Sequence, residues 1–289
     1  MKKKNYLLMF FTITLIWTWV IGFVPIIFGM QNTVIGDLLF KILVGPAPSI
    51  IGLIMVFATY SKEQRKGYIR RCFNIKQLGL IFPILLIALY IFVCLLTIFI
   101  STNFLGGSVP EFAGLKSVIR QPLTIFIYLF FTLISGPLNE EFGWRGYALD
   151  HLFKKYSFVK ASLILGLIWG IWHLPWYFYP SNGQYIAWSI SPIHGMYFIA
   201  NSMTTSLLVS ICYVKKNRSV IAGALVHLLS NFLVGGTLIY PFDNTYIIIS
   251  MYVASILELV VSIIIINRKK FKAQFTKIKE NIKDEFKNY

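Results

Sequence analysis

The chain alternates between long apolar runs and short polar connections. A helix that crosses a bilayer needs about 20 mostly apolar residues, and eight runs approach or exceed that length. We predict membrane-spanning helices at residues 6–29, 37–59, 78–100, 122–142 (with a possible continuation to about 153), 161–179, 192–213, 219–240 and 244–266. Pro137 and Pro175 should break or kink the fourth and fifth runs. The pattern therefore predicts an all-α, polytopic integral membrane protein, with one membrane domain over residues 1–266.

The composition agrees with this pattern. Of the 289 residues, 57% are hydrophobic and 13% are charged, whereas a soluble domain usually has about 25% charged residues. The net charge is +16, but the basic residues cluster between and after the apolar runs. Anionic lipid headgroups lie at those positions, so we expect membrane lipids and no nucleic acid as partners. The odd cysteine count (Cys72, Cys94 and Cys212) argues against a disulfide framework.

Positive charge alternates from one connection to the next. Lysine and arginine are frequent at residues 2–4, 62–76, 145–160, 215–218 and from 268 onward, whereas the connections between these regions carry few or none. By the positive-inside rule, the basic connections should face the cytosol. We therefore expect a multi-pass protein of the cell membrane with both termini in the cytosol.

The basic segment 267–289 has an amphipathic pattern. Phe271, Phe275, Ile278, Ile282 and Phe286 recur at spacings of three and four residues, which places them on one face of a helix. We predict a helix that lies along the cytosolic membrane surface. The alternative is a solvated tail.

The segment Asn139–Tyr147 carries two adjacent carboxylates and an arginine at the end of the fourth apolar run. A charged side chain at the bilayer centre costs at least about 2.5–3.5 kcal/mol, so such residues usually mark a functional site. Glu141 and Arg145 have the spacing of a helical ion pair with the acid first. Glu140 lies about 100° around the helix from Glu141, so that pairing leaves it unpaired. It is therefore a candidate general base.

Three polar residues in other apolar runs are candidate partners of Glu140: His173, His227 and Asn231. His227 and Asn231 are four residues apart and share a helix face. Depth can be estimated by counting residues from each position to the nearest lysine or arginine at a membrane boundary. At 1.5 Å per residue, all four positions lie roughly 13–21 Å below the cytosolic boundary. Each residue alone could be a hydrogen-bonded packing residue, which is how we interpret His151 and His194. Together they indicate one polar site built from three helices.

These motifs also carry a resemblance to a known family. Glu140-Glu141-x-x-x-Arg145, Trp169-x-x-x-His173 and His227-x-x-x-Asn231, within about residues 122–235, resemble the motif series of the CAAX-processing and bacteriocin-processing (Abi) intramembrane proteases. Within that family, the chain looks most like an archaeal homologue of the Ras-converting CAAX prenyl endopeptidases. The family more often has phenylalanine at the position of Trp169.

The resemblance implies a substrate and a mechanism. The substrate would be a prenylated protein that ends in Cys-a-a-X, and the enzyme would remove its last three residues at a site that opens to the cytosolic side. Glu140, helped by His173, would activate a water molecule, and His227 and Asn231 would stabilise the oxyanion. Glu141 and Arg145 would give structural support. This mechanism needs no cofactor.

Other functions remain open from the sequence. Two histidines and a glutamate form a ligand set that Zn²⁺ accepts, so a zinc-dependent intramembrane protease with a different substrate is an alternative. Against it, the chain has no His-Glu-x-x-His motif, and asparagine is a poor zinc ligand. Buried ionisable residues also occur in transporters, although no internal repeat is visible. A non-catalytic scaffold is a third possibility.

Overall fold

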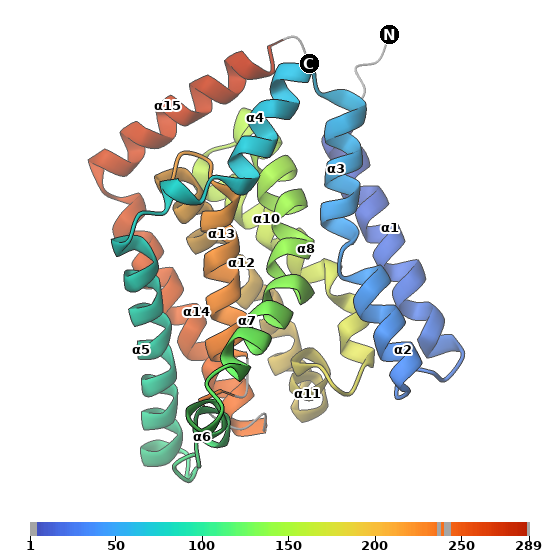
Figure 1. Ribbon diagram of the computed structural model, residues 1–289, viewed down its shortest axis with the longest axis vertical. Helices are drawn as coiled ribbons and strands as arrows, with labels where there is room; N and C mark the ends of the chain where they lie inside the picture. The colour runs from blue at the N-terminus through green and yellow to red at the C-terminus, as the bar shows by residue number, and fades with distance from the viewer. Residues whose placement is uncertain (1–4, 236–237, 240–243, 288–289) are drawn as a thin grey trace.

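The computed structural model describes residues 5–235, 238–239 and 244–287, and these form a bundle of helices without strands (Figure 1). The predicted all-α, polytopic membrane fold is confirmed. Within the described residues, six helical segments are long and apolar enough to cross a membrane: Tyr6–Ile27, Val34–Thr59, Ile81–Phe104, Phe158–Phe178, Pro192–Lys215 and Tyr246–Ile266. Lys2–Lys4 and residues 240–243, which entered the sequence predictions, lie outside the described residues.

Five long helices make up most of the bundle: α1 (Tyr6–Ile27), α5 (Ile81–Phe104), α10 (Phe158–Trp172), α12 (Pro192–Lys215) and α14 (Asn244–Ile266). The second predicted span is composite. It consists of α2 (Val34–Leu39), a π-helical segment η1 (Phe40–Val44) and α3 (Ala47–Thr59).

The fourth and seventh predicted spans consist of shorter helices. The fourth contains α7 (Thr124–Ser135), α8 (Pro137–Gly143), the π-helical segment η3 (Trp144–Ala148) and α9 (Leu149–Lys155). The seventh contains α13 (Val220–Leu229) and the π-helical segment η5 (Ser230–Val234).

Both proline breaks occur where they were predicted. Pro137 is the first residue of α8, a position that does not need its missing N–H group. Pro175 lies in a short 3₁₀ helix, η4 (Leu174–Phe178), that follows the end of α10 at Trp172. The two breaks lie beside the sequence motifs that carry Glu140 and His173.

Short helices in the connections distinguish the two ends of the bundle. The helices α4 (Lys62–Phe73) and α15 (Lys269–Glu285) lie at one end, with the short 3₁₀ turn η2 (Ile75–Gln77) directly after α4. At the opposite end lie α2, α6 (Ala113–Arg120) and α11 (Gly183–Ile190) (Figure 1). The basic connections therefore gather at the α4/α15 end.

Close backbone packing positions α8, the helix that carries both adjacent glutamates. A Cβ atom at Gly143 would overlap the carbonyl group of Pro48, and one at Gly52 would lie 2.7 Å from the Cα atom of Gly143. The hydroxyl of Ser49 donates to the carbonyl oxygen of Leu138 at 2.9 Å. Helices α3 and α8 can approach this closely only because glycine occupies the contact.

Asp150, on α9, is the centre of a buried charge cluster at the α4/α15 end. It accepts hydrogen bonds from Tyr213 at 2.8 Å, from Arg71 at 3.4 Å and from Arg218. Burial alone would lower the pKa of the Arg218 guanidinium, but Asp150, Tyr213 and Glu285 together outweigh that effect, and the pKa lies well above its ordinary value. The cluster therefore places acidic and basic side chains in direct contact within the protein interior.

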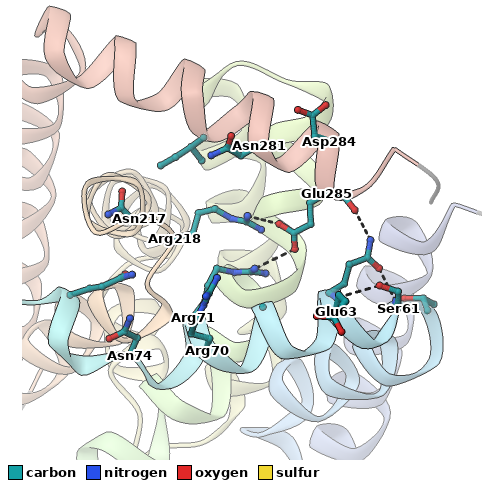
Figure 2. A pocket seen from close by; sticks show the side chains of 15 residues that line it. Ser61, Glu63, Arg70, Arg71, Asn74, Asn217, Arg218, Asn281, Asp284 and Glu285 are labelled. Carbon is teal, nitrogen blue, oxygen red and sulfur yellow. Dashed lines mark hydrogen bonds and ion pairs between the residues drawn. The ribbon is translucent and has the colours of Figure 1, made fainter.

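The same two arginines hold the end of α15. Glu285 accepts from Arg218 at 2.6 Å and from Arg71 at 3.3 Å, as Figure 2 shows. Its carbonyl oxygen accepts from Gln64 on α4 at 2.6 Å. The C-terminal helix is therefore attached both to α4 and to the connection that precedes α13.

The predicted apolar face of α15 is correct, but its expected contact with lipid is wrong. Phe271, Ile278, Ile282 and Phe286 are buried in the protein core. The ring of Phe271 lies 5.0 Å from that of Phe158, and Phe275 lies 5.0 Å from Phe153. An amphipathic pattern defines the buried face but not what covers it, and here α9 and α10 cover it.

We expect Asp150→Ala to lower the stability of the fold strongly. The substitution leaves the buried guanidinium groups of Arg71 and Arg218 without their shared partner, and breaking a buried ion pair typically costs about 3–5 kcal/mol. Thermal unfolding of the purified protein in detergent measures the effect. The control is Glu63→Ala, which removes an exposed ion pair with Lys66 and should cost less than about 1 kcal/mol. Equal losses in the two variants would contradict this account of the cluster.

Candidate active site

A cavity of about 530 Å³ lies between the helices, and four predicted site residues line it. Glu140 comes from α8, His173 from the C-terminal end of α10, His227 from α13 and Asn231 from η5. Residues separated by up to 91 positions in the chain therefore meet in one place. The expected single polar site is present in the structure.

Glu141 forms the predicted ion pair and a second contact that the sequence did not indicate. Its Oε1 atom accepts from Nη1 of Arg145 at 2.9 Å and lies 3.0 Å from Nδ1 of His227. Arg145 also donates from Nη2 to the hydroxyl of Ser206 on α12 at 3.2 Å. Because Glu141 and Arg145 are fully buried, this network is part of the protein interior.

Glu140 has a different environment from its neighbour. Its Oε2 atom accepts from the indole N–H of Trp169 at 2.6 Å and from that of Trp144 at 3.4 Å. Its Oε1 atom lies 4.0 Å from Nε2 of His227. Two neutral donors thus hold one carboxylate oxygen, while the other oxygen lies on the side of His227.

The protonation pattern of both histidine rings follows from their partners. Nδ1 of His173 lies 2.8 Å from the carbonyl oxygen of Trp169, which can only accept, so Nδ1 carries the hydrogen. In a neutral ring, Nε2 of His173 then has a free lone pair. Nδ1 of His227 likewise donates to Glu141. The ring of His227 lies between the carboxylates of Glu140 and Glu141. Its Nε2 atom can donate only when both ring nitrogens carry a hydrogen.

Three site residues converge on one point beside Gly136. A Cβ atom at Gly136 would lie 2.9 Å from Nδ2 of Asn231, 3.5 Å from Nε2 of His227 and 3.7 Å from Oε1 of Glu140. Glycine leaves this point open. A donor, an imidazole nitrogen and a carboxylate oxygen can therefore act on the same small group.

The cavity extends from Glu140 toward the α2/α11 end of the bundle. Its lining continues to Ser181–Gln184, which precede and begin α11, and to Ile247 near the start of α14. Toward α4 and α15, the fully buried side chains of Trp144 and Tyr147 lie behind the site. The lining residues therefore extend toward the α2/α11 end of the bundle, opposite to α4 and α15 (Figure 1).

The grouping of candidate metal ligands bears on the zinc alternative. Across residues 5–235, 238–239 and 244–287, no three or more His, Cys, Asp or Glu side chains are grouped so that they could hold a metal ion. His227 also uses Nδ1 for Glu141.

Two comparisons with known proteins bear on the family. The model of the type II CAAX prenyl endopeptidase Rce1-like family matches residues 122–233. The chain is 30% identical to CAAX prenyl protease 2 of Methanococcus maripaludis over 224 residues, which cover 77% of this chain and 82% of that protein. The chain belongs to the Rce1-like CAAX prenyl endopeptidase family. All six site residues, from Glu140 to Asn231, lie within the part that matches the family model.

The sequence did not reveal two features of the site. It identified Trp169 only as an aromatic motif residue, whereas its indole N–H binds Glu140. It also gave no signal for the contact between Glu141 and His227, which lie 86 residues apart. His151 and His194 do not line the cavity, in agreement with their interpretation as packing residues; His194 instead lies 3.0 Å from the hydroxyl of Tyr252.

The two adjacent glutamates should respond differently to the same substitution. Glu141→Gln leaves the buried guanidinium of Arg145 without a counter-charge, so we expect a loss of about 3 kcal/mol or more in stability. Glu140→Gln keeps an oxygen that can accept from Trp169 and should change stability by less than about 1 kcal/mol. Thermal unfolding in detergent compares the two variants. A larger loss for Glu140→Gln would contradict this division of roles.

Proposed function

We propose that this protein is an intramembrane endopeptidase that removes the C-terminal tripeptide from prenylated CAAX proteins. The observation that carries the proposal is the convergence of Glu140, His227 and Asn231 beside Gly136, in a cavity between candidate membrane spans of a chain that belongs to this family. The prenyl chain of the substrate partitions into the surrounding lipid, while the peptide enters the cavity. The expected partners are therefore the prenylated substrate and membrane lipids.

Glu140 activates the water molecule that attacks the carbonyl carbon of the prenylated cysteine. The indole groups of Trp169 and Trp144 orient the carboxylate, so that Oε1 can accept a proton from water near Gly136. His173 assists through Nε2, which has a free lone pair in the neutral ring. A positioned general base of this kind typically accelerates a reaction by about 10²–10⁴-fold.

Asn231 and His227 stabilise the oxyanion that forms in this step. Nδ2 of Asn231 is a donor in every protonation state, and Nε2 of His227 donates when the ring is doubly protonated. One such donor is worth about 2.7–4 kcal/mol in other hydrolases. Glu141 and Arg145 take no part in the reaction but hold His227 and the turn that carries Glu140.

The proposed hydrolysis needs no metal ion. Glu140 takes a proton from the attacking water and passes it to the nitrogen of the leaving tripeptide as the C–N bond breaks, and no step uses a Lewis acid. A zinc-dependent protease with another substrate is the competing proposal, and chelation distinguishes the two.

The location of the substrate determines the orientation that we propose. A CAAX protein is prenylated in the cytosol, so the open end of the cavity, at α2 and α11, must face the cytosol. That orientation puts α4 and α15 on the outer side of the cell membrane. It conflicts with the expectation from positive charge, because the basic helices α4 and α15 lie at the opposite end of the bundle from α2 and α11.

Cleavage of a farnesylated CAAX peptide by the purified protein in detergent tests the reaction. We expect the wild type to release the terminal tripeptide and Glu140→Gln to lose about 10²–10⁴-fold in kcat/KM while it stays folded. A strong chelator should leave wild-type cleavage unchanged. Activity that is lost on chelation and restored by Zn²⁺ would favour the metalloprotease, and cleavage by Glu140→Gln at the wild-type rate would refute the assigned base.

Cysteine accessibility in intact cells tests the orientation. Cys72, Cys94 and Cys212 are all buried, so single exposed cysteines can be introduced over a low background. We expect a membrane-impermeant thiol reagent to label Lys277→Cys on α15 in intact cells, and to label Lys116→Cys on α6 only after permeabilisation. The reverse pattern would place the cavity entrance outside the cell and would contradict processing of cytosolic proteins.

A further inference from the structure

The proposed mechanism does not use a cation that lines the active-site cavity. Lys41, in η1, is the single lysine or arginine among the described residues that line this cavity. Its side chain is exposed, although it lies within the candidate membrane span Val34–Thr59. Charged residues within membrane spans are rare and usually functional, so Lys41 is a candidate for a second role at this site.

Lys41 lies one helical turn before Gly45, and Gly45 lies beside the segment that carries the proposed base. A Cβ atom at Gly45, four residues after Lys41, would lie 3.2 Å from the carbonyl oxygen of Lys41 and 3.7 Å from Nδ2 of Asn139. Asn139 directly precedes Glu140. Lys41 follows α2 directly in the chain, and α2 lies at the α2/α11 end of the bundle (Figure 1).

The chemistry of the proposed substrate requires a cation in such a place. The peptide ends in a carboxylate three residues after the scissile bond, and three extended residues span about 10 Å. The carboxylate therefore stays within or at the entrance of the cavity during cleavage. Glu140 repels it, whereas the positive charge of an ammonium group on a flexible four-carbon stem attracts it.

We propose that Lys41 binds the C-terminal carboxylate of the substrate. This inference rests on the proposed endopeptidase function and adds a specificity determinant to it. Glu140 defines where the chain is cut, and Lys41 defines how far that point lies from a free C-terminus. The pair selects a leaving group of three residues without reading their side chains.

Two peptides that differ only at the C-terminus test the assignment. The substrate is a farnesylated CAAX peptide, made once as the free acid and once as the carboxamide, and kcat/KM is measured for each with the full-length protein in detergent. A charge-assisted hydrogen bond corresponds to about tenfold or more in affinity, so we expect the wild type to prefer the acid by at least that factor. Lys41→Met should bring the ratio close to one through loss of activity on the acid alone.

Three further variants complete the experiment. Lys41→Arg should keep the preference for the acid, Lys41→Glu should favour the amide, and Lys116→Met, which removes an exposed lysine from α6 at the same end of the bundle, should behave as the wild type. A wild type that cleaves both peptides equally, or a Lys41→Met variant that keeps the preference, overturns the role of Lys41 and leaves the proposed function intact. If the wild type cleaves neither peptide, the proposed function fails and this inference fails with it.

Discussion

The carboxylate of Glu141 is buried and binds two other buried groups whose positions determine the site. It pairs with Arg145 one turn further along the chain and with Nδ1 of His227, which is 86 residues away on α13. The first contact stabilises the turn that carries Glu140, and the second attaches that turn to the helix that carries His227 and leads to Asn231. A charge in an apolar interior must be compensated where it lies. The geometry at Gly136 therefore depends on a residue that does not line the cavity.

Three π-helical segments of the described chain adjoin the site. Phe40–Val44 carries Lys41, Trp144–Ala148 follows the two glutamates, and Ser230–Val234 carries Asn231. A π turn contains one more residue than an α turn, and such turns often occur at functional sites. Each extra residue rotates the following side chains relative to an unbroken helix. In this protein, residues of two of these segments line the cavity: Phe40 and Lys41 of η1, and Ser230, Asn231 and Val234 of η5.

The sequence predicted the parts of the structure that depend on local rules. Apolar run length located the spans, Pro137 and Pro175 located the breaks, and four-residue spacing identified the pair of Glu141 and Arg145. It did not predict contacts between distant segments, such as those of Asp150 with Arg71 and Arg218, because periodicity says nothing about which faces meet. For the same reason, the apolar face of α15 was correct while its partner was not. Charge alternation likewise separated the ends of the bundle without showing at which end the cavity opens.

The two adjacent glutamates are compensated in different ways, and the difference suits a hydrolase. An arginine places a full positive charge beside a carboxylate, and in this protein that arginine pairs with Glu141. Glu140 instead receives hydrogen bonds from the neutral indole groups of Trp169 and Trp144. These donors fix the direction of the carboxylate without adding a full positive charge. A general base needs both properties: it must be held against its substrate, and it must still accept a proton from water.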